Sequence, residues 1–187
     1  MTKVLQRRRF TVDEYYRMGE TGILADDERL ELIAGHIIVR EPIGARHAGT
    51  VDRLTRLWTS RLGERAIVRI QNPVRFAKQG SELQPDVMLL RPRNDFYTAS
   101  HPVAADVLLL IEVADTSVRL ERRVRIPLYA RARVREIWLC DLVSQRVEVH
   151  REPAGRRYRA VRTLARGESL ANLAFPDVAV MVEDLLG

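Results

Sequence analysis

The sequence contains one cysteine, two lysines and no apolar run long enough to cross a membrane. The single Cys140 excludes an intramolecular disulfide, and a free thiol in an apolar segment fits a reducing compartment. The basic N-terminus leads into no apolar signal segment, so we expect a cytoplasmic protein that does not contact membranes. Low-complexity segments and internal repeats are also lacking, and with 46% hydrophobic residues the composition is that of a globular chain.

The scarcity of lysine leaves arginine to carry the positive charge. Of the 31 basic residues 29 are arginine, and the net charge is +6. Arginine forks match the geometry of phosphate groups, so this balance is consistent with a polyanionic partner such as DNA. The same bias can reflect the base composition of the coding sequence, and charge alone does not decide between these readings.

At 187 residues the chain is long enough for one domain with a substantial core. We expect a basic tail at residues 1–9 and a single domain at residues 10–187. The elements predicted in the first half are a helix capped by Thr11 and Glu14, a hairpin at residues 30–40 turning at Ala34-Gly35, an amphipathic helix at residues 47–62, a strand at 65–76 bent near Asn72-Pro73, and a turn at 77–85.

Three apolar runs dominate the second half. Residues 87–90 and 107–113 predict strands, and the second run is so uniformly apolar that it should be a central strand covered on both faces. A helix should begin near Val124 or Arg125, because Pro127 is tolerated only in a first turn. Further strands are predicted over residues 136–142, 146–152 and 157–164, followed by a short strand and an apolar terminal segment. The predicted fold class is therefore α+β, with helices packed on a mixed sheet.

Two acids accompany the apolar runs. Asp86 leads the first run and Glu112 lies near the end of the second. A carboxylate among β-formers is costly to bury unless something pairs with it, and strand neighbours could share one cation. Mg²⁺ prefers oxygen ligands and usually takes one or two protein carboxylates, which would suit phosphodiester chemistry. Glu31, a lone acid in a predicted strand, could equally point to solvent, and His47 could be a cap, a surface residue or a reader of phosphate.

Several short motifs occur in the order found in one protein family. They are "LELIAGHIIVRE", "RH" at the start of a helix, "QPDV", "IEVADTS", a charged helix ending in "PLYARA", and "EIWLCD". From about residue 10 to residue 185 the chain resembles the Uma2-like proteins, described as restriction endonucleases of the PD-(D/E)XK nuclease-like superfamily. The resemblance implies a restriction-endonuclease-like core with flanking helices, an N-terminal helix and hairpin, and hydrolysis of DNA phosphodiester bonds with Mg²⁺ or Mn²⁺.

The family's functional positions carry over residue by residue. Glu31 matches the early acid, Asp86 the aspartate of the "PD" signature, and Glu112 the acid of the central strand. The superfamily's lysine, two residues after that acid, is Ala114 here. Uma2-like proteins instead supply a lysine from the following helix, and in "ERRVRIPLY" that position is Arg125. The implied sites are therefore catalytic Glu31, Asp86, Glu112 and Arg125, metal-binding Asp86 and Glu112, and nucleic-acid-binding His47, Arg122 and Arg125.

The arginine at position 125 departs from the family pattern. Arginine keeps the positive charge but essentially never deprotonates, so it cannot act as a general base. We therefore expect the fold and metal site to persist with impaired catalysis, although a metal that does most of the activation would let Arg125 suffice. The alternatives are a non-catalytic nucleic-acid-binding protein with the nuclease fold, and an interaction module whose acids pair with arginines. The residues leave the oligomeric state open, and cutting both strands would favour a homodimer.

Overall fold

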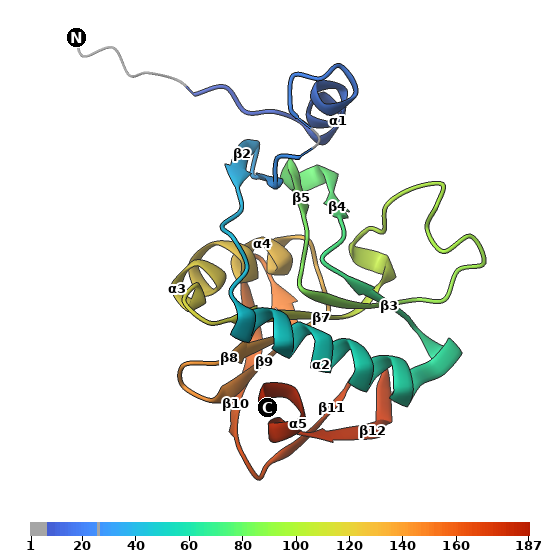
Figure 1. Ribbon diagram of the computed structural model, residues 1–187, viewed down its shortest axis with the longest axis vertical. Coiled ribbons are helices and arrows are strands. Elements are labelled where there is room, and N and C mark those ends of the chain that lie inside the picture. Colours follow the sequence, from blue (N-terminus) through green and yellow to red (C-terminus); the bar gives the residue numbers. More distant parts are fainter. Residues whose placement is uncertain (1–6, 26) are drawn as a thin grey trace.

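The computed structural model describes residues 7–25 and 27–187. Residues 1–6, most of the expected basic tail, and residue 26 lie outside the described part. The described chain is α+β, with three sheets of six, four and two strands (Figure 1). The predicted fold class is confirmed.

The six-stranded sheet is the centre of the molecule. Its strands are β3 (Ile67–Ile70), β6 (Val87–Leu90), β7 (Val107–Ala114), β8 (Glu136–Asp141), β9 (Arg146–Ala154) and β10 (Arg157–Ala165), in the spatial order β10-β9-β8-β7-β6-β3. Only β7 and β8 pair in parallel. A parallel pair needs a long crossover, and the helical segment between these two strands supplies it.

Strand β7 lies between β6 and β8 and is covered on both faces, as its apolar sequence predicts. One face packs against α2 (Ala45–Leu62), and on the same side of the sheet α5 (Val182–Leu186) covers β8 and β9. The ring centroids of Trp58 from α2 and Trp138 from β8 lie 5.6 Å apart there. The other face packs against α4 (Ile126–Arg131), with Tyr129 fully buried. Because successive strand residues alternate between the faces, Leu110 and Glu112 lie on the α4 side.

A four-stranded sheet lies above the central one in Figure 1, in the order β2-β1-β5-β4. Its strands are β1 (Leu30–Ile33), β2 (His36–Val39), β4 (Val74–Phe76) and β5 (Ser81–Leu83). The predicted hairpin of β1 and β2 is confirmed. The single bent strand predicted over residues 65–76 is wrong, since β3 and β4 belong to different sheets. Gln71 has a φ of 47°, and Pro73 has no N–H to continue a ladder, so the chain leaves one sheet for the other here.

The turn predicted for residues 77–85 is also wrong in part, because it contains β5 after a short helical turn, η2 (Ala77–Gln79). Other short turns are η1 (Gly63–Arg65) and η3 (Ala104–Asp106). The C-terminal segment holds two strands, β11 (Ser169–Asn172) and β12 (Phe175–Met181), which form a hairpin where a single strand was expected.

The first helix, α1 (Val12–Glu20), confirms the predicted capping box. The Glu14 N–H donates to Thr11 Oγ1 at 3.1 Å, and the Thr11 N–H donates to Glu14 Oε2 at 2.9 Å. These reciprocal bonds satisfy two N–H groups that lack partners within the helix.

The crossover segment begins earlier than the predicted start near Val124. It consists of α3 (Val118–Leu120), a wide turn η4 (Glu121–Arg125), and α4. The Ile126 N–H donates to Glu121 O, five residues back, which inserts one extra residue into the helical turn. Glu121 and Arg125 are both buried as a result, and Pro127 falls in the first turn of α4, where it is tolerated. No helix in the described residues combines the length and hydropathy required to cross a bilayer.

Candidate active site

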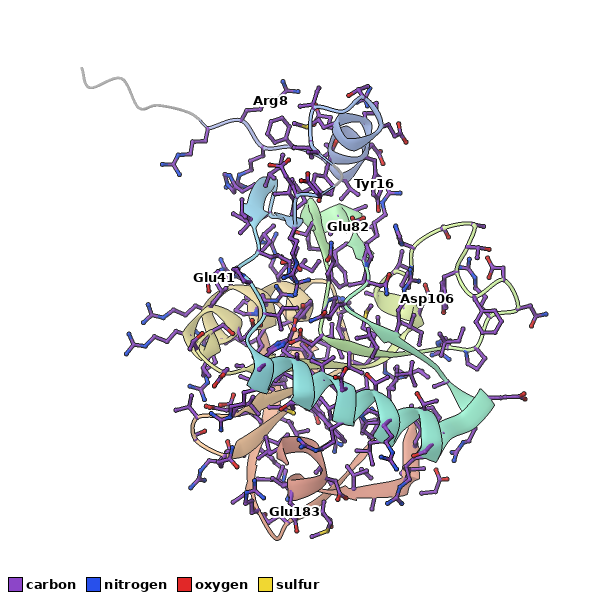
Figure 2. All side chains as sticks on the ribbon, in the orientation of Figure 1. Arg8, Tyr16, Glu41, Glu82, Asp106 and Glu183 are labelled. Carbon is purple, nitrogen blue, oxygen red and sulfur yellow. The ribbon has the colours of Figure 1, made fainter. Side chains whose placement is uncertain are left out.

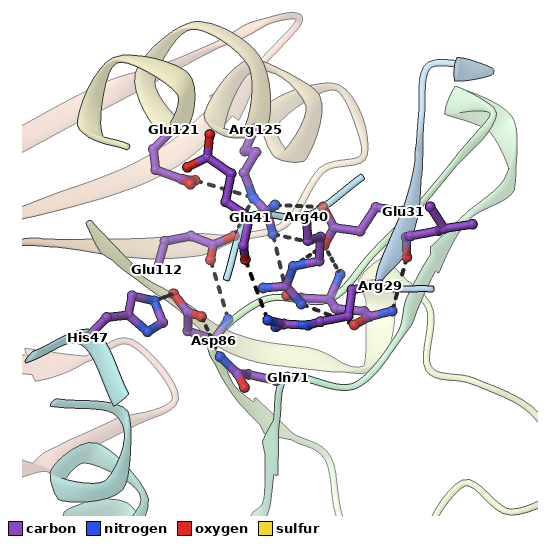
Figure 3. Close-up of polar contacts among 12 residues, drawn as sticks. Arg29, Glu31, Arg40, Glu41, His47, Gln71, Asp86, Glu112, Glu121 and Arg125 are labelled. Carbon is purple, nitrogen blue, oxygen red and sulfur yellow. Dashed lines mark hydrogen bonds and ion pairs between the residues drawn. The ribbon is translucent and has the colours of Figure 1, made fainter. Parts of the chain in front are cut away.

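Asp86 and Glu112, the two acids singled out in the sequence, lie against each other. Asp86 comes directly before β6, and Glu112 follows the β7 residue that pairs with Val87. The Asp86 N–H donates to Glu112 Oε2 at 3.3 Å, and the two side chains are 5% and 2% exposed. Figure 3 shows them between the start of α2 and the crossover helices. The predicted neighbourhood of the two acids is what the structure shows.

Asp86 accepts hydrogen bonds from three different elements. His47 Nε2 lies 3.0 Å from Oδ2, the Val113 N–H donates to the same oxygen at 2.9 Å, and Gln71 Nε2 donates to Oδ1 at 3.2 Å. Burial raises the pKa of Asp86, but the hydrogen bond and positive charge of His47, with the other two donors, outweigh it and leave that pKa below its ordinary value. Asp86 is therefore an anion at neutral pH.

Glu112 faces the crossover helices. Arg125 Nε donates to Oε1 at 3.0 Å, and the Tyr129 hydroxyl donates to the same oxygen. Burial raises the pKa of Glu112, and the negative charge of Asp86 adds to that rise against the opposing pull of Arg125. Burial also raises the pKa of the Tyr129 hydroxyl well above its ordinary value, so this hydroxyl stays protonated and donates its hydrogen bond.

Arg125 connects Glu112 to Glu31. Its Nη1 donates to Glu31 Oε2 at 2.8 Å and its Nη2 to Glu31 Oε1 at 3.3 Å, while Nη2 also approaches Gln84 O at 3.4 Å. Burial disfavours the guanidinium charge, but the surrounding carboxylates raise the pKa of Arg125 well above its ordinary value. Glu31 is 2% exposed and points into this cluster rather than to solvent. The Arg125 guanidinium therefore supplies positive charge inside a buried cluster of acids.

Glu121 completes the cluster from the wide helical turn. Its Oε2 lies 3.3 Å from Arg125 Nε, but the single Nε hydrogen already donates to Glu112, and Oε2 makes no hydrogen bond in the described structure. Burial, reinforced by the charge of Glu112, raises the pKa of Glu121 well above its ordinary value. The buried surroundings of Glu121 therefore favour the protonated form of its carboxyl group.

Two further arginines border the cluster at the β1–β2 hairpin (Figure 3). Arg40 Nη1 donates to Gln84 Oε1 at 3.0 Å and Arg40 Nε lies 3.8 Å from Glu31 Oε1. Arg29 Nη1 donates to Glu41 O at 3.4 Å. These arginines place two positive charges on the hairpin side of the cluster.

The free positions on the carboxylate oxygens decide whether the two acids could hold a hard divalent cation. Each carboxylate oxygen can accept about two hydrogen bonds or metal contacts. Asp86 Oδ2 and Glu112 Oε1 each receive two donors, whereas Asp86 Oδ1 and Glu112 Oε2 each receive one. Two carboxylate oxygens are what Mg²⁺ usually takes from a protein, so the pair fits. No cluster of three His, Cys, Asp or Glu side chains suited to a metal occurs in the described chain.

The structure separates the expected nucleic-acid contacts. His47 and Arg125 lie inside the cluster, whereas Arg122 is turned outward and donates from Nε to Glu148 Oε1 at 2.9 Å. Sequence reasoning missed Gln71 and Tyr129 as members of the site. Tyr129 could have been found from the "PLY" segment of the family pattern, while Gln71 carries no sequence signal because only the break between β3 and β4 aims it at Asp86.

Replacing His47 with alanine is expected to lower the free energy of unfolding by about 2 kcal/mol near pH 5.5, because Asp86 loses a charge-assisted donor. The hydrogen bond to Asp86 raises the pKa of His47 above 6.5, so this stabilisation is complete below pH 6.5 and is lost as pH rises through the folded-state value. Because the pKa of Asp86 is lowered from 3.8, the stabilisation that Asp86 contributes is present above pH 3.8 and is lost as pH falls through the folded-state value.

Urea unfolding of wild type and His47→Ala at several pH values measures this difference, which should be largest between about pH 4 and 6.5. His36→Ala, on the partly exposed strand β2, should change stability by no more than about 0.5 kcal/mol. A His47→Ala effect that grows above pH 8 would contradict the pairing.

The sequence profile of the Uma2 family, described as "Putative restriction endonuclease", matches residues 12–183. Among solved structures, a protein from Anabaena variabilis ATCC 29413 described as a "putative nuclease belonging to DUF820" superposes with a TM-score of 0.72 at 16% identity, covering 95% of this chain and 97% of that one. No curated protein matches.

The match to the family profile covers most of the chain, and the structural neighbour shares the fold along nearly its whole length. Asp86, Glu112 and Arg125 all lie within the matched residues. The chain belongs to the Uma2 family of restriction-endonuclease-like proteins.

Proposed function

We propose that the protein hydrolyses phosphodiester bonds in DNA with Mg²⁺ or Mn²⁺ held by Asp86 and Glu112, and that Arg125 keeps the rate low. The observation that supports this most directly is the contact between the two acids. Asp86 directly precedes β6 and Glu112 lies on the neighbouring strand β7, the Asp86 N–H joins them, and each acid retains an oxygen with a single donor. The Uma2 family and the nuclease described above make nucleic acid the substrate class to test first.

In this proposal the residues of the site have different roles around the phosphate. His47 and Gln71 orient the Asp86 carboxylate, and Tyr129 orients that of Glu112. Arg125 offers positive charge to an anionic transition state, but it cannot take a proton from water. A bound divalent cation would polarise the phosphodiester and lower the pKa of a coordinated water.

A second candidate is a protein that binds nucleic acid without cutting it. The observation in its favour is that the Arg125 guanidinium already offsets the charge of Glu112 and Glu31, with all three side chains at most 7% exposed. In that case the arginine-rich exterior would bind the phosphate backbone and the acid cluster would serve only to stabilise the fold.

Incubation of supercoiled plasmid with purified protein, with and without Mg²⁺ or Mn²⁺, separates the two candidates. The proposed enzyme nicks plasmid only with metal, and Asp86→Asn reduces nicking to the level without metal. Salt-sensitive binding of labelled duplex without nicking supports the second candidate. Neither cutting nor binding would reject both. Light scattering of the free protein tests the homodimer that double-strand cutting would favour.

A further inference from the structure

A concave site lies away from the acid cluster, among α1, β4 and the loop that follows β6. It is a pocket of about 430 Å³ whose lining includes Tyr16, Arg75, Thr98, Ser100 and His101. Figure 1 shows the loop arching outward beside β4, and Figure 2 shows Tyr16 on the underside of α1. The volume falls within the range of small-ligand sites in proteins.

The pocket is rich in hydrogen-bond donors. His101 Nδ1 lies 3.4 Å from Arg69 Nη2, and since arginine only donates, Nδ1 accepts and the imidazole proton is on Nε2. Within the described residues, neither that Nε2–H nor the hydroxyls of Thr98 and Ser100 have a protein partner. Three donors are thus left for a ligand.

Two arginines make the pocket positive. Arg75 lies over the Tyr16 ring at 5.4 Å, and its Nη2 donates to Asp13. In the described chain the Nε of Arg75 has no acceptor, and Nη1 of Arg69, the arginine that contacts His101, has none either. Among the described residues no aspartate or glutamate lines the pocket, and the side chain of Asp13 is 75% exposed. Unsatisfied buried donors are costly, so an acceptor-rich ligand would relieve them.

Hydrogen bonds hold Arg75 and both ends of the loop in place. The Arg75 N–H donates to Pro102 O at 2.8 Å, and Arg75 pairs with Val103 in an isolated β-bridge. The Tyr97 hydroxyl donates to Arg91 O at 2.9 Å and fixes the start of the loop. A pocket whose walls are fixed in advance loses little entropy on binding.

We propose that this pocket binds a phosphate group, either as free phosphate or as the phosphate of a nucleotide, through Arg75, His101 and the hydroxyls of Thr98 and Ser100. Apart from one residual proton, phosphate at neutral pH offers only oxygens that accept hydrogen bonds. These oxygens match a lining that, among the described residues, contains donors and no carboxylate. The site is separate from Asp86 and Glu112, so it does not depend on the function proposed above.

The charges around His101 support the same ligand. Burial lowers the pKa of His101, and the charges of Arg69 from β3 and Arg75 from β4 lower it further. Tyr16 stacks on the imidazole ring from α1, and Asp13 pairs with Arg75. An anion bound beside His101 would reverse part of this shift, so its pKa should rise on binding.

The test is titration of ¹⁵N-labelled protein, followed through the imidazole signals of its four histidines, with inorganic phosphate, deoxyadenosine 5′-monophosphate and deoxyadenosine. We expect saturable shifts of the His101 signals with both phosphates and none with deoxyadenosine. At least tenfold tighter binding of the monophosphate than of phosphate would identify a nucleotide, and equal binding would identify free phosphate. Absence of a saturable His101 shift with either phosphate would overturn the proposal.

Variants distinguish this site from others. Arg75→Gln should weaken phosphate binding about tenfold or more, whereas Arg159→Gln on the exposed side of β10 should leave it unchanged. Asp86→Asn should also bind normally, which separates the pocket from the acid cluster. If Arg75→Gln does not fold, Ser100→Ala provides the second measurement, with roughly three- to tenfold weaker binding expected. Unchanged affinity in the folded variant would refute the site.

Discussion

Replacing Arg125 with methionine is expected to lower the free energy of unfolding by about 3–5 kcal/mol, the usual cost of removing one partner from a buried ion pair. Arg125 is 6% exposed and supplies the hydrogen-bond donors that link Glu112 and Glu31. Without it these acids would be buried together with no positive charge between them. Chemical denaturation at pH 8, followed by circular dichroism, measures the loss.

The size of this loss should depend on pH in a defined direction. Glu112 and Glu121 already have raised pKa values in the folded protein, and removing the nearby positive charge raises them further. A raised acid pKa means that stability is present at low pH and is lost as pH rises through the folded-state value. The penalty should therefore be smaller at pH 5 than at pH 8.

Arg123→Met is the matched control for that experiment. Arg123 lies two residues away in the same wide turn, is exposed, and forms no ion pair in the described structure. Its replacement should change the unfolding free energy by no more than about 0.5 kcal/mol. An Arg125→Met protein as stable as this control would show that the guanidinium does not hold the cluster together.

The second large effect is expected from Arg125→Lys, which should raise metal-dependent DNA cleavage about 100-fold. A lysine keeps the positive charge between Glu31 and Glu112, but its compact amine has freely rotating donors and an adjustable pKa. It could therefore hold and help to activate a water molecule, whereas the three arginine nitrogens are already committed to Glu112, Glu31 and Gln84.

Plasmid nicking rates at saturating Mg²⁺ or Mn²⁺ for wild type and Arg125→Lys check this prediction. The double variant Asp86→Asn with Arg125→Lys should be inactive, which ties any gain to the acid pair. Arg123→Lys controls for the loss of one guanidinium from the same turn. If wild type cuts rapidly and Arg125→Lys cuts more slowly, the idea that arginine impairs this site is wrong.

Much of the fold was determined by the sequence itself. The capping box at Thr11, the hairpin around Ala34-Gly35 and the central strand β7 were predicted because each depends on local chemistry or on apolar residues at a strand period. The family pattern, carried by short motifs, likewise singled out Asp86, Glu112 and Arg125 as candidates, and the structure brings these three side chains together. The predicted starts of helices and strands failed where Gln71, Pro73 and the turn at Glu121 changed the chain's direction.

Only the tertiary structure decided what each charged group does. The sequence could not say that Glu31 is buried, that Arg125 connects it to Glu112, or that His47 and Gln71 reach Asp86 from α2 and from the end of β3. Nor could it assemble the donor pocket of Arg75 and His101. The physical reason is that electrostatic roles depend on distance and burial, and residues such as Glu31 and Arg125, 94 positions apart in the chain, are brought within hydrogen-bonding distance only when the sheets and helices pack.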